Sequence, residues 1–293
     1  MKPAIGESST RYFKRRPTDP LNITDRDLDA LALLDELILM NTHQMRARFG
    51  MEFVKVRLKR LYHHGYVERV EAQRRIRLLK GGGSQALVLS LTNKGARLLN
   101  EHDRLRHKKR DWNERNRLLK PWSLSHPLSV SDVAVAFDIA FDRVNDHELA
   151  RRLDPKLIVA PGFDTPIIPD LVHELMTFDG RRSILCHEID CGSMPNTRHD
   201  DSDLQSLAWK FERYLAYAKS GASERDFGTK SLRVLTIVSG GKEKKRNVAQ
   251  TAKAVCDGVG VDRFLVATLE DVQKRSVLEP IWINAGGEVR SLL

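Results

Sequence analysis

The 293-residue sequence predicts two domains of mixed helix and strand: an α+β domain, then an α/β domain with a mixed sheet flanked by helices. The length is near the size at which a single hydrophobic core usually stops growing. Positive charge is confined to one half, since residues 1–120 contain 27 Lys and Arg against 14 Asp and Glu, whereas residues 121–293 contain 22 against 25. Helical periodicity and a hairpin pattern dominate the first half, and strands alternate with helices in the second.

The composition is that of a globular protein, with 41% hydrophobic and 30% charged residues. The longest apolar stretch near the start, Leu31–Met40, is interrupted by Asp35 and Glu36 and is far shorter than the roughly 20 residues of a membrane span. We therefore expect a cytoplasmic protein with no secretory signal and no membrane partner, and three cysteines fit a reducing compartment. The expected segments are a basic flexible N-terminus (1–23), a first domain (24–102), a basic linker (103–124) and a second domain (125–293).

Three helices are predicted at the start of the first domain, over Thr24–Met40, Thr42–Arg48 and Glu52–His64. Thr24 and Thr42 are expected as N-caps, and Gly50 ends the second helix. The third helix has an apolar stripe on one side and basic residues on the other. A hairpin is predicted next, with strands at 74–80 and 86–91 around a glycine-rich turn, and a further helix starts after Thr92.

This order of elements, with the segments His64-Gly-Tyr-Val-Glu-Arg69 and Leu91-Thr-Asn-Lys-Gly95, resembles winged helix-turn-helix DNA-binding domains over residues 24–102. The resemblance implies that the third helix enters the major groove of double-stranded DNA and that the hairpin lies along the backbone. The implied DNA contacts are Lys55, Arg57, Lys59, Arg74, Arg75, Arg77 and Lys80. Each of these side chains can equally be a solvated surface charge. The winged fold also serves as a protein-interaction module, which the positive charge argues against.

Pro121 and Pro127 are interpreted as the boundary of the second domain, and Ser131 as the cap of its first helix. The predicted elements are a helix at 132–144, a hairpin of 166–176 and 183–190, a helix at 204–219, a strand at 232–238, a helix at 248–255 and a strand at 263–267. This series predicts a mixed sheet flanked by helices.

Three acids are predicted to meet at the end of the hairpin. Glu188 and Asp190 share one strand face because side chains alternate, and Asp170 lies at the head of the neighbouring strand. Such acids also end strands as solvated caps, but the apolar Ile184 and Cys186 on the same face favour a site. Carboxylates beside a phosphate suit Mg²⁺ or Mn²⁺, so the pattern indicates metal-assisted phosphodiester cleavage.

The segment from Pro169-Asp170 to Glu188-Ile-Asp190 resembles the PD-(D/E)XK signature of restriction-endonuclease-like nucleases. Where that family usually has a lysine this chain has Asp190, which puts activity in doubt. Lys210, with Tyr214 one helical turn later, is the candidate substitute.

A wider resemblance, spanning nearly the whole chain, is to the replication-relaxation family of mobile elements, which is similar to mobilisation-protein-C type relaxases of plasmids. The segments that carry it are Ser125-His-Pro-Leu-Ser-Val-Ser-Asp132, Pro169-Asp170, His187-Glu-Ile-Asp-Cys-Gly192, Lys210-Phe-Glu-Arg-Tyr214, Arg233-Val-Leu-Thr-Ile237 and Pro280-Ile-Trp282. It implies Asp170, Glu188 and Asp190 as metal ligands, Lys210 as a phosphate or water contact, and an origin region with transfer or replication proteins as partners.

Zinc and nucleotide cofactors are not expected. Cys186 and His187 point to opposite strand faces, unlike paired zinc ligands. The segment after the 232–238 strand, Ser239-Gly-Gly-Lys242, lacks the full phosphate-loop pattern.

Two functions stay open: a metal-dependent DNA nickase or relaxase of a mobile element, and a non-catalytic DNA-binding accessory or regulator with a degenerate nuclease fold.

Overall fold

The computed structural model describes residues 14–16, 19–73, 86–142, 147–154, 158–177, 180–192, 195–196, 206–256 and 258–293. The chain divides into two compact units, residues 1–131 and 132–293. The predicted boundary between residues 124 and 125 differs from this division, which falls inside helix α8 (Ser125–Phe141). The predicted class of mixed α and β structure, with a mixed sheet flanked by helices, is confirmed.

The first unit combines helices with a small antiparallel sheet of strand order β1-β3-β2. Its strands are β1 (Met40–Asn41), β2 (Val67–Arg69) and β3 (Val88–Leu91). Its helical segments are α2 (Asp25–Leu37), α3 (Thr42–Phe49), the π-helical η1 (Phe53–Leu58), α4 (Lys59–His63), α6 (Asn93–Glu101), α7 (Trp112–Leu118) and the short η2 (Pro121–Ser123). A cluster that includes Leu39, Val70 and Val88 is buried beside this sheet.

Local capping chemistry sets the ends of the first helices. Thr24 caps α2 in a reciprocal capping box with Asp27, as predicted. The helix ends at Leu37, short of the predicted Met40, because Ile38 adopts a φ of 72° that a right-handed helix does not allow. The cap of α3 is Asn41, not Thr42 as predicted, since the Asn41 side chain accepts the backbone N–H groups that open the helix.

The predicted hairpin is seen in part. The second strand, predicted at 86–91, is observed as β3, and it pairs with β2 on one side and β1 on the other. The first predicted strand, at 74–80, lies outside the described residues. Assignment of this unit as a winged helix therefore stays a prediction.

The predicted linker at 103–124 contains packed structure. It includes α7, whose first residue, Trp112, is completely buried and lies beneath the guanidinium of Arg110. Trp112 therefore anchors this segment to the first unit, because a single tryptophan buries enough apolar area to hold a short helix.

The second unit contains a seven-stranded sheet of order β10-β9-β8-β7-β6-β5-β4. The strands are β4 (His147–Leu153), β5 (Leu171–Thr177), β6 (Arg182–Asp190), β7 (Leu232–Val238), β8 (Phe264–Thr268), β9 (Trp282–Asn284) and β10 (Val289–Arg290). The pairs β6–β7 and β7–β8 are parallel and the other pairs are antiparallel. The predicted β5–β6 hairpin and the β7 strand are confirmed, whereas β4, β9 and β10 were not predicted.

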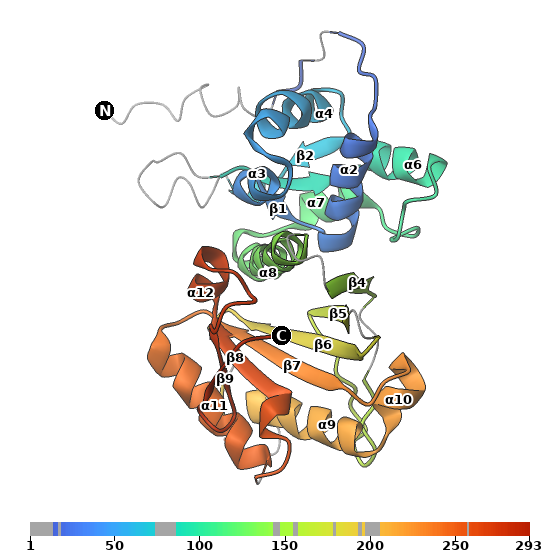
Figure 1. The fold of residues 1–293 in the computed structure, drawn as a ribbon. Helices are drawn as coiled ribbons and strands as arrows, with labels where there is room; N and C mark the ends of the chain where they lie inside the picture. The colour runs from blue at the N-terminus through green and yellow to red at the C-terminus, as the bar shows by residue number, and fades with distance from the viewer. Residues whose placement is uncertain are drawn as a thin grey trace, which may run out of the picture. The chain divides into compact units, whose positions relative to one another are not determined.

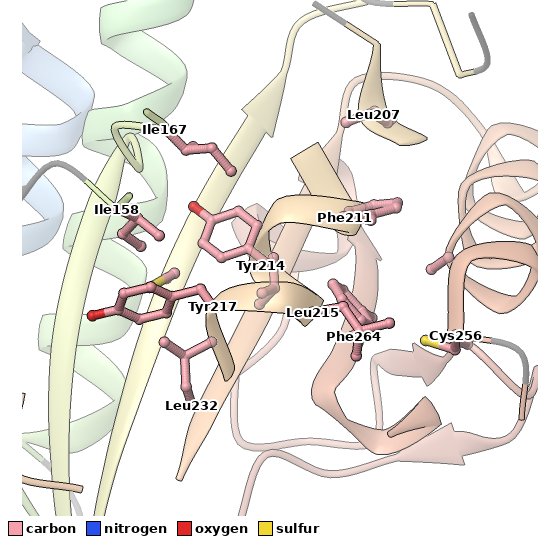
Figure 2. Close-up of a cluster of buried hydrophobic side chains, with 14 of the residues drawn as sticks. Ile158, Ile167, Leu207, Phe211, Tyr214, Leu215, Tyr217, Leu232, Cys256 and Phe264 are labelled. Carbon is pink, nitrogen blue, oxygen red and sulfur yellow. The ribbon is translucent and has the colours of Figure 1, made fainter. Parts of the chain in front are cut away.

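Helices cover both faces of this sheet (Figure 1). The helical segments are α8, α9 (Leu207–Lys219), α10 (Ala222–Phe227), α11 (Lys242–Cys256), η3 (Val261–Arg263) and α12 (Leu269–Lys274). Helices α9 and α11 pack on one face, where Phe211 meets Phe264 of β8 and Tyr214 and Tyr217 join the same buried cluster (Figure 2). On the other face, Phe137 of α8 packs against strand residues of β5 and β6.

Helix α8 begins at Ser125, seven positions before the predicted Asp132, so the predicted cap at Ser131 is wrong. Ser131 is buried inside the helix, where its hydroxyl donates to the backbone oxygens of Leu39 and Pro127. Pro127 does not break the helix because it lies in the first turn, where its missing N–H would have no partner.

Within the described residues, every helix is too short or too polar to cross a membrane.

Candidate functional site: a carboxylate and lysine cluster at the end of β6

The strand register places Asp170 directly opposite Glu188. Leu171 pairs with His187 across the antiparallel β5–β6 ladder, so Asp170 lies one step before β5, level with Glu188. The backbone N–H of Asp170 donates to the His187 oxygen at 2.9 Å, and the Asp170 carboxylate accepts the N–H of Ile189 at 2.7 Å. The half-buried Asp170 carboxylate is therefore held against β6 between Glu188 and Asp190.

Glu188 is buried, with 1% of its surface exposed, and both of its carboxylate oxygens are engaged. Oε1 accepts the hydroxyl of Tyr214 at 2.6 Å, and Oε2 forms an ion pair with Lys210 Nζ. Burial raises the pKa of Glu188 to about 7, which the Lys210 charge opposes and the nearby Asp170 reinforces. Glu188 therefore exchanges a proton near neutral pH.

Asp190 ends β6 and is also buried, with 2% exposed. Its Oδ1 accepts the N–H of Gly192 at 2.8 Å, and its Oδ2 forms an ion pair with Lys244 of α11. Because β6 and β7 are parallel, the loop after β7 that leads into α11 returns beside the end of β6. This topology carries Lys244 to Asp190.

Lys210 is the central cation of the cluster. Burial alone would lower its pKa, but the surrounding carboxylates outweigh burial and raise the pKa. These carboxylates belong to Glu188, Asp170 and Asp190. Lys210 therefore stays protonated at neutral pH, so it can stabilise negative charge but cannot act as a general base.

Two further features adjoin the cluster. Thr236 pairs with Glu188 in the β6–β7 ladder, and its hydroxyl is buried with no hydrogen-bond partner in the described part of the chain. A pocket of about 510 Å³ is lined by Lys244 together with Asn196, Gly241, Glu243 and Asn247. The Lys244 side chain thus joins this pocket to buried Asp190.

Among the described residues, no group of three or more His, Cys, Asp and Glu side chains is arranged to hold a metal ion. Glu188 and Asp190 are each neutralised by a lysine instead. A hard cation such as Mg²⁺ needs only one or two carboxylates when substrate phosphate completes its shell, and the oxygen donors present are of the right kind. The predicted three-acid metal site stays a prediction.

Cys186 and His187 take opposite faces of β6, as the alternation predicted. Cys186 is buried in the cluster under α9, whereas His187 lies against Phe137 of α8. His187 Nε2 shares a 2.7 Å hydrogen bond with His173 Nδ1, and burial lowers the pKa of His187 to about 3. Both rings are therefore neutral and belong to the sheet core.

The predicted DNA contacts of the first unit divide into three groups. Lys55 and Lys59 are exposed on η1 and α4. Arg57 is held within the unit, because its guanidinium forms an ion pair with buried Asp27 and donates to the Asn22 oxygen at 2.7 Å. The remaining residues, Arg74, Arg75, Arg77 and Lys80, lie outside the described residues.

Sequence reasoning missed Lys244 and Thr236. Lys244 falls in a run of charged residues at 242–246, a pattern typical of a solvated helix start. The signal that could have found it is the order of strand, Gly-Gly, lysine and helix that follows β7. Thr236 carried no signal, since only the ladder register places it beside Glu188.

Comparison with known families gives one match: the replication-relaxation family model matches residues 31–232, more than half of the chain. The match includes Asp170, Glu188, Asp190 and Lys210, and it ends before Lys244. Searches of curated proteins and of solved structures found no match.

Proposed function

Because the chain belongs to the replication-relaxation family, whose members point to a role in plasmid replication or mobilisation, we propose that it nicks or relaxes DNA of a mobile element with a divalent cation. In this proposal the first unit recognises double-stranded DNA in an origin region, and the second unit cleaves one strand at the end of β6.

The observation that carries the proposal is the set of acids from paired strand ends. Asp170 raises the pKa of Glu188, and both act on Lys210 together with Asp190. The raised pKa of about 7 shows that burial disfavours the ionised form of Glu188, and a bound cation would stabilise that form. Such perturbed groups gather at functional sites more often than elsewhere.

Asp170, Glu188 and Asp190 would hold the cation, and Mg²⁺ or Mn²⁺ would stabilise charge on the phosphate and lower the pKa of a water molecule. Lys210 remains an ammonium group, so its part is to contact a phosphate oxygen and offset the charge that develops there. Tyr214 fixes the Glu188 carboxylate through its hydroxyl, and burial and Glu188 keep its pKa well above the usual value. Tyr214 is therefore a positioning residue and does not supply a phenolate nucleophile.

Recognition of DNA is assigned to the first unit. The winged-helix resemblance of the sequence supports this assignment, and Lys55 and Lys59 are exposed on the segment that would meet the major groove. Arg57 contributes by fixing that helix to Asp27.

The proposal is tested with a supercoiled plasmid that carries the origin of the element encoding the chain, in Mg²⁺ or Mn²⁺. We expect nicking by the natural protein and a loss of roughly 100-fold or more for Asp170→Asn and for Glu188→Gln, because each removes a ligand charge worth several kcal/mol. Asp164→Asn, an exposed acid, is the matched control. Nicking that survives both site substitutions excludes this site.

A second function is favoured by the ion pairs. Glu188 with Lys210 and Asp190 with Lys244 are neutralised within the chain, as expected of a nuclease fold that has become a DNA-binding accessory or regulator. This function predicts salt-dependent DNA binding without nicking in any metal, and binding that Glu188→Gln leaves unchanged.

A further inference from the structure

The first unit contains a hollow of about 800 Å³ on the side formed by α6 and α7. Basic residues line it from three segments: Arg15 near the start of the chain, Lys94 and Arg97 of α6, and Arg117 of α7. Asn113 and Asn116 of α7 add amide groups. This is the size of a ligand site, with walls that suit an anion carrying further polar groups.

The charge of the hollow is only partly compensated. Of the two acids in its lining, Glu68 forms an ion pair with Arg15. Arg97 and Arg117 are exposed and form no ion pair with any described residue. A polyanion can therefore contact these guanidinium groups without first displacing a carboxylate.

An exposed aromatic residue follows the hollow along the chain. Leu119 lines the hollow, and Trp122 lies three residues later, a span of at most about 11 Å. Trp122 is 77% exposed, whereas the other three tryptophans, Trp112, Trp209 and Trp282, are at most 5% exposed. An indole this exposed in a basic segment offers a flat surface to a planar group.

The geometry points to a binding site for single-stranded DNA, in which phosphates follow the Arg97 and Arg117 side of the hollow and a base stacks on Trp122. A positively charged groove combined with an aromatic platform is how proteins hold single strands without reading their sequence. A duplex lacks free base faces, so it cannot use Trp122 in this way. The inference rests on the proposed function, since unwinding of a nicked duplex exposes a single strand.

The site is tested with the full-length protein in EDTA, using a dT20 oligonucleotide and a 20-base-pair duplex as probes. We expect dT20 to quench and shift the tryptophan fluorescence, because Trp122 is the solvent-exposed indole of the four. Trp122→Ala should weaken dT20 binding by about 5- to 150-fold, the range for loss of one base stack, whereas Trp122→Phe should retain most of the affinity.

The contribution of Arg97 and Arg117 is measured separately, from the salt dependence of binding. Arg97→Gln and Arg117→Gln should each lower the log–log salt slope of dT20 binding by about 0.7, the value for one phosphate contact on a single strand. Arg246→Gln, an exposed arginine of the second unit, is the matched control and should leave the slope unchanged.

Equal dT20 affinity for Trp122→Ala and the natural protein overturns the inference. So does an equal loss of dT20 and duplex affinity, which would make Trp122 a duplex contact. Because the measurement needs no divalent cation, dT20 binding can persist when plasmid nicking fails, and the two proposals fail separately.

Discussion

Lysines of the first unit are exposed to solvent, whereas two lysines of the second unit pair with buried carboxylates. Lys55 and Lys59 are exposed on the first unit, and neither forms an ion pair with a described residue. Lys210 and Lys244 lie in the second unit against carboxylates that are almost completely buried. The exposed lysines interact with solvent and ions, and salt screens their charges. Removing either of the partly buried lysines instead leaves a buried carboxylate without its ion-pair partner.

The strongest test of this contrast is Lys210→Met. We expect the free energy of unfolding to fall by about 3–5 kcal/mol at pH 8, since Glu188 is left as an unpaired buried carboxylate. At pH 5.5 the loss should be smaller, because Glu188, whose pKa is already raised, takes up a proton and becomes neutral. Urea denaturation at both pH values measures this. Lys210→Met combined with Glu188→Gln should recover most of the loss, and equal losses at both pH values would contradict the argument.

Arg57 is the exception within the first unit, because like Lys210 and Lys244 it pairs with a buried carboxylate. Arg57→Ala leaves Asp27 buried without its ion pair, so we expect a loss of about 1.5–3 kcal/mol at pH 7. Burial raises the pKa of Asp27, but the bonds from Arg57 and Thr24 outweigh burial and lower it. A lowered pKa contributes stability that is present above the unfolded pKa and is lost as pH falls through the folded value. The stability difference between Arg57→Ala and the natural protein should therefore shrink as the pH falls. Urea denaturation from pH 7 to pH 3 measures it, and a difference that stays constant would contradict the argument.

Binding of Mg²⁺ should depend on the proton of Glu188. Below its pKa of about 7, we expect affinity to rise about tenfold per pH unit, because the ion displaces one proton, and to level off above that value. Calorimetric titration with Mg²⁺ between pH 5.5 and pH 8.5 measures this. Glu188→Gln should remove the slope, and an unchanged slope in that variant would assign the proton to another group.

The smallest effects are expected at the exposed lysines. Lys55→Ala and Lys59→Ala should each lower the log–log salt slope of duplex binding by about 0.9, with no change in urea stability. Lys253→Ala, an exposed lysine of the second unit, is the control. If both variants keep the salt slope of the natural protein, neither lysine contacts a DNA phosphate.

Predictions succeeded where a pattern of neighbouring residues carried the information. The capping box at Thr24, the hairpin of β5 and β6 and the bounds of β7 all follow from local chemistry and alternation. The start of α8 was missed because Pro127 was interpreted as a boundary, although the first turn of a helix tolerates proline. Strand β4 was missed because it reads as a run of mostly polar residues, and only pairing with β5 defines it.

The sequence by itself determined which acids share a face of β6, since side chains alternate along any strand, and it determined the family to which the chain belongs. The tertiary structure decided which cation each acid meets. Lys210 and Lys244 come from helices distant in sequence, and the parallel β6–β7 pairing returns α11 to Asp190. Burial of Glu188, and with it a pKa near 7, likewise arises only when α9 closes over the sheet, because desolvation depends on packing rather than on neighbours in the chain.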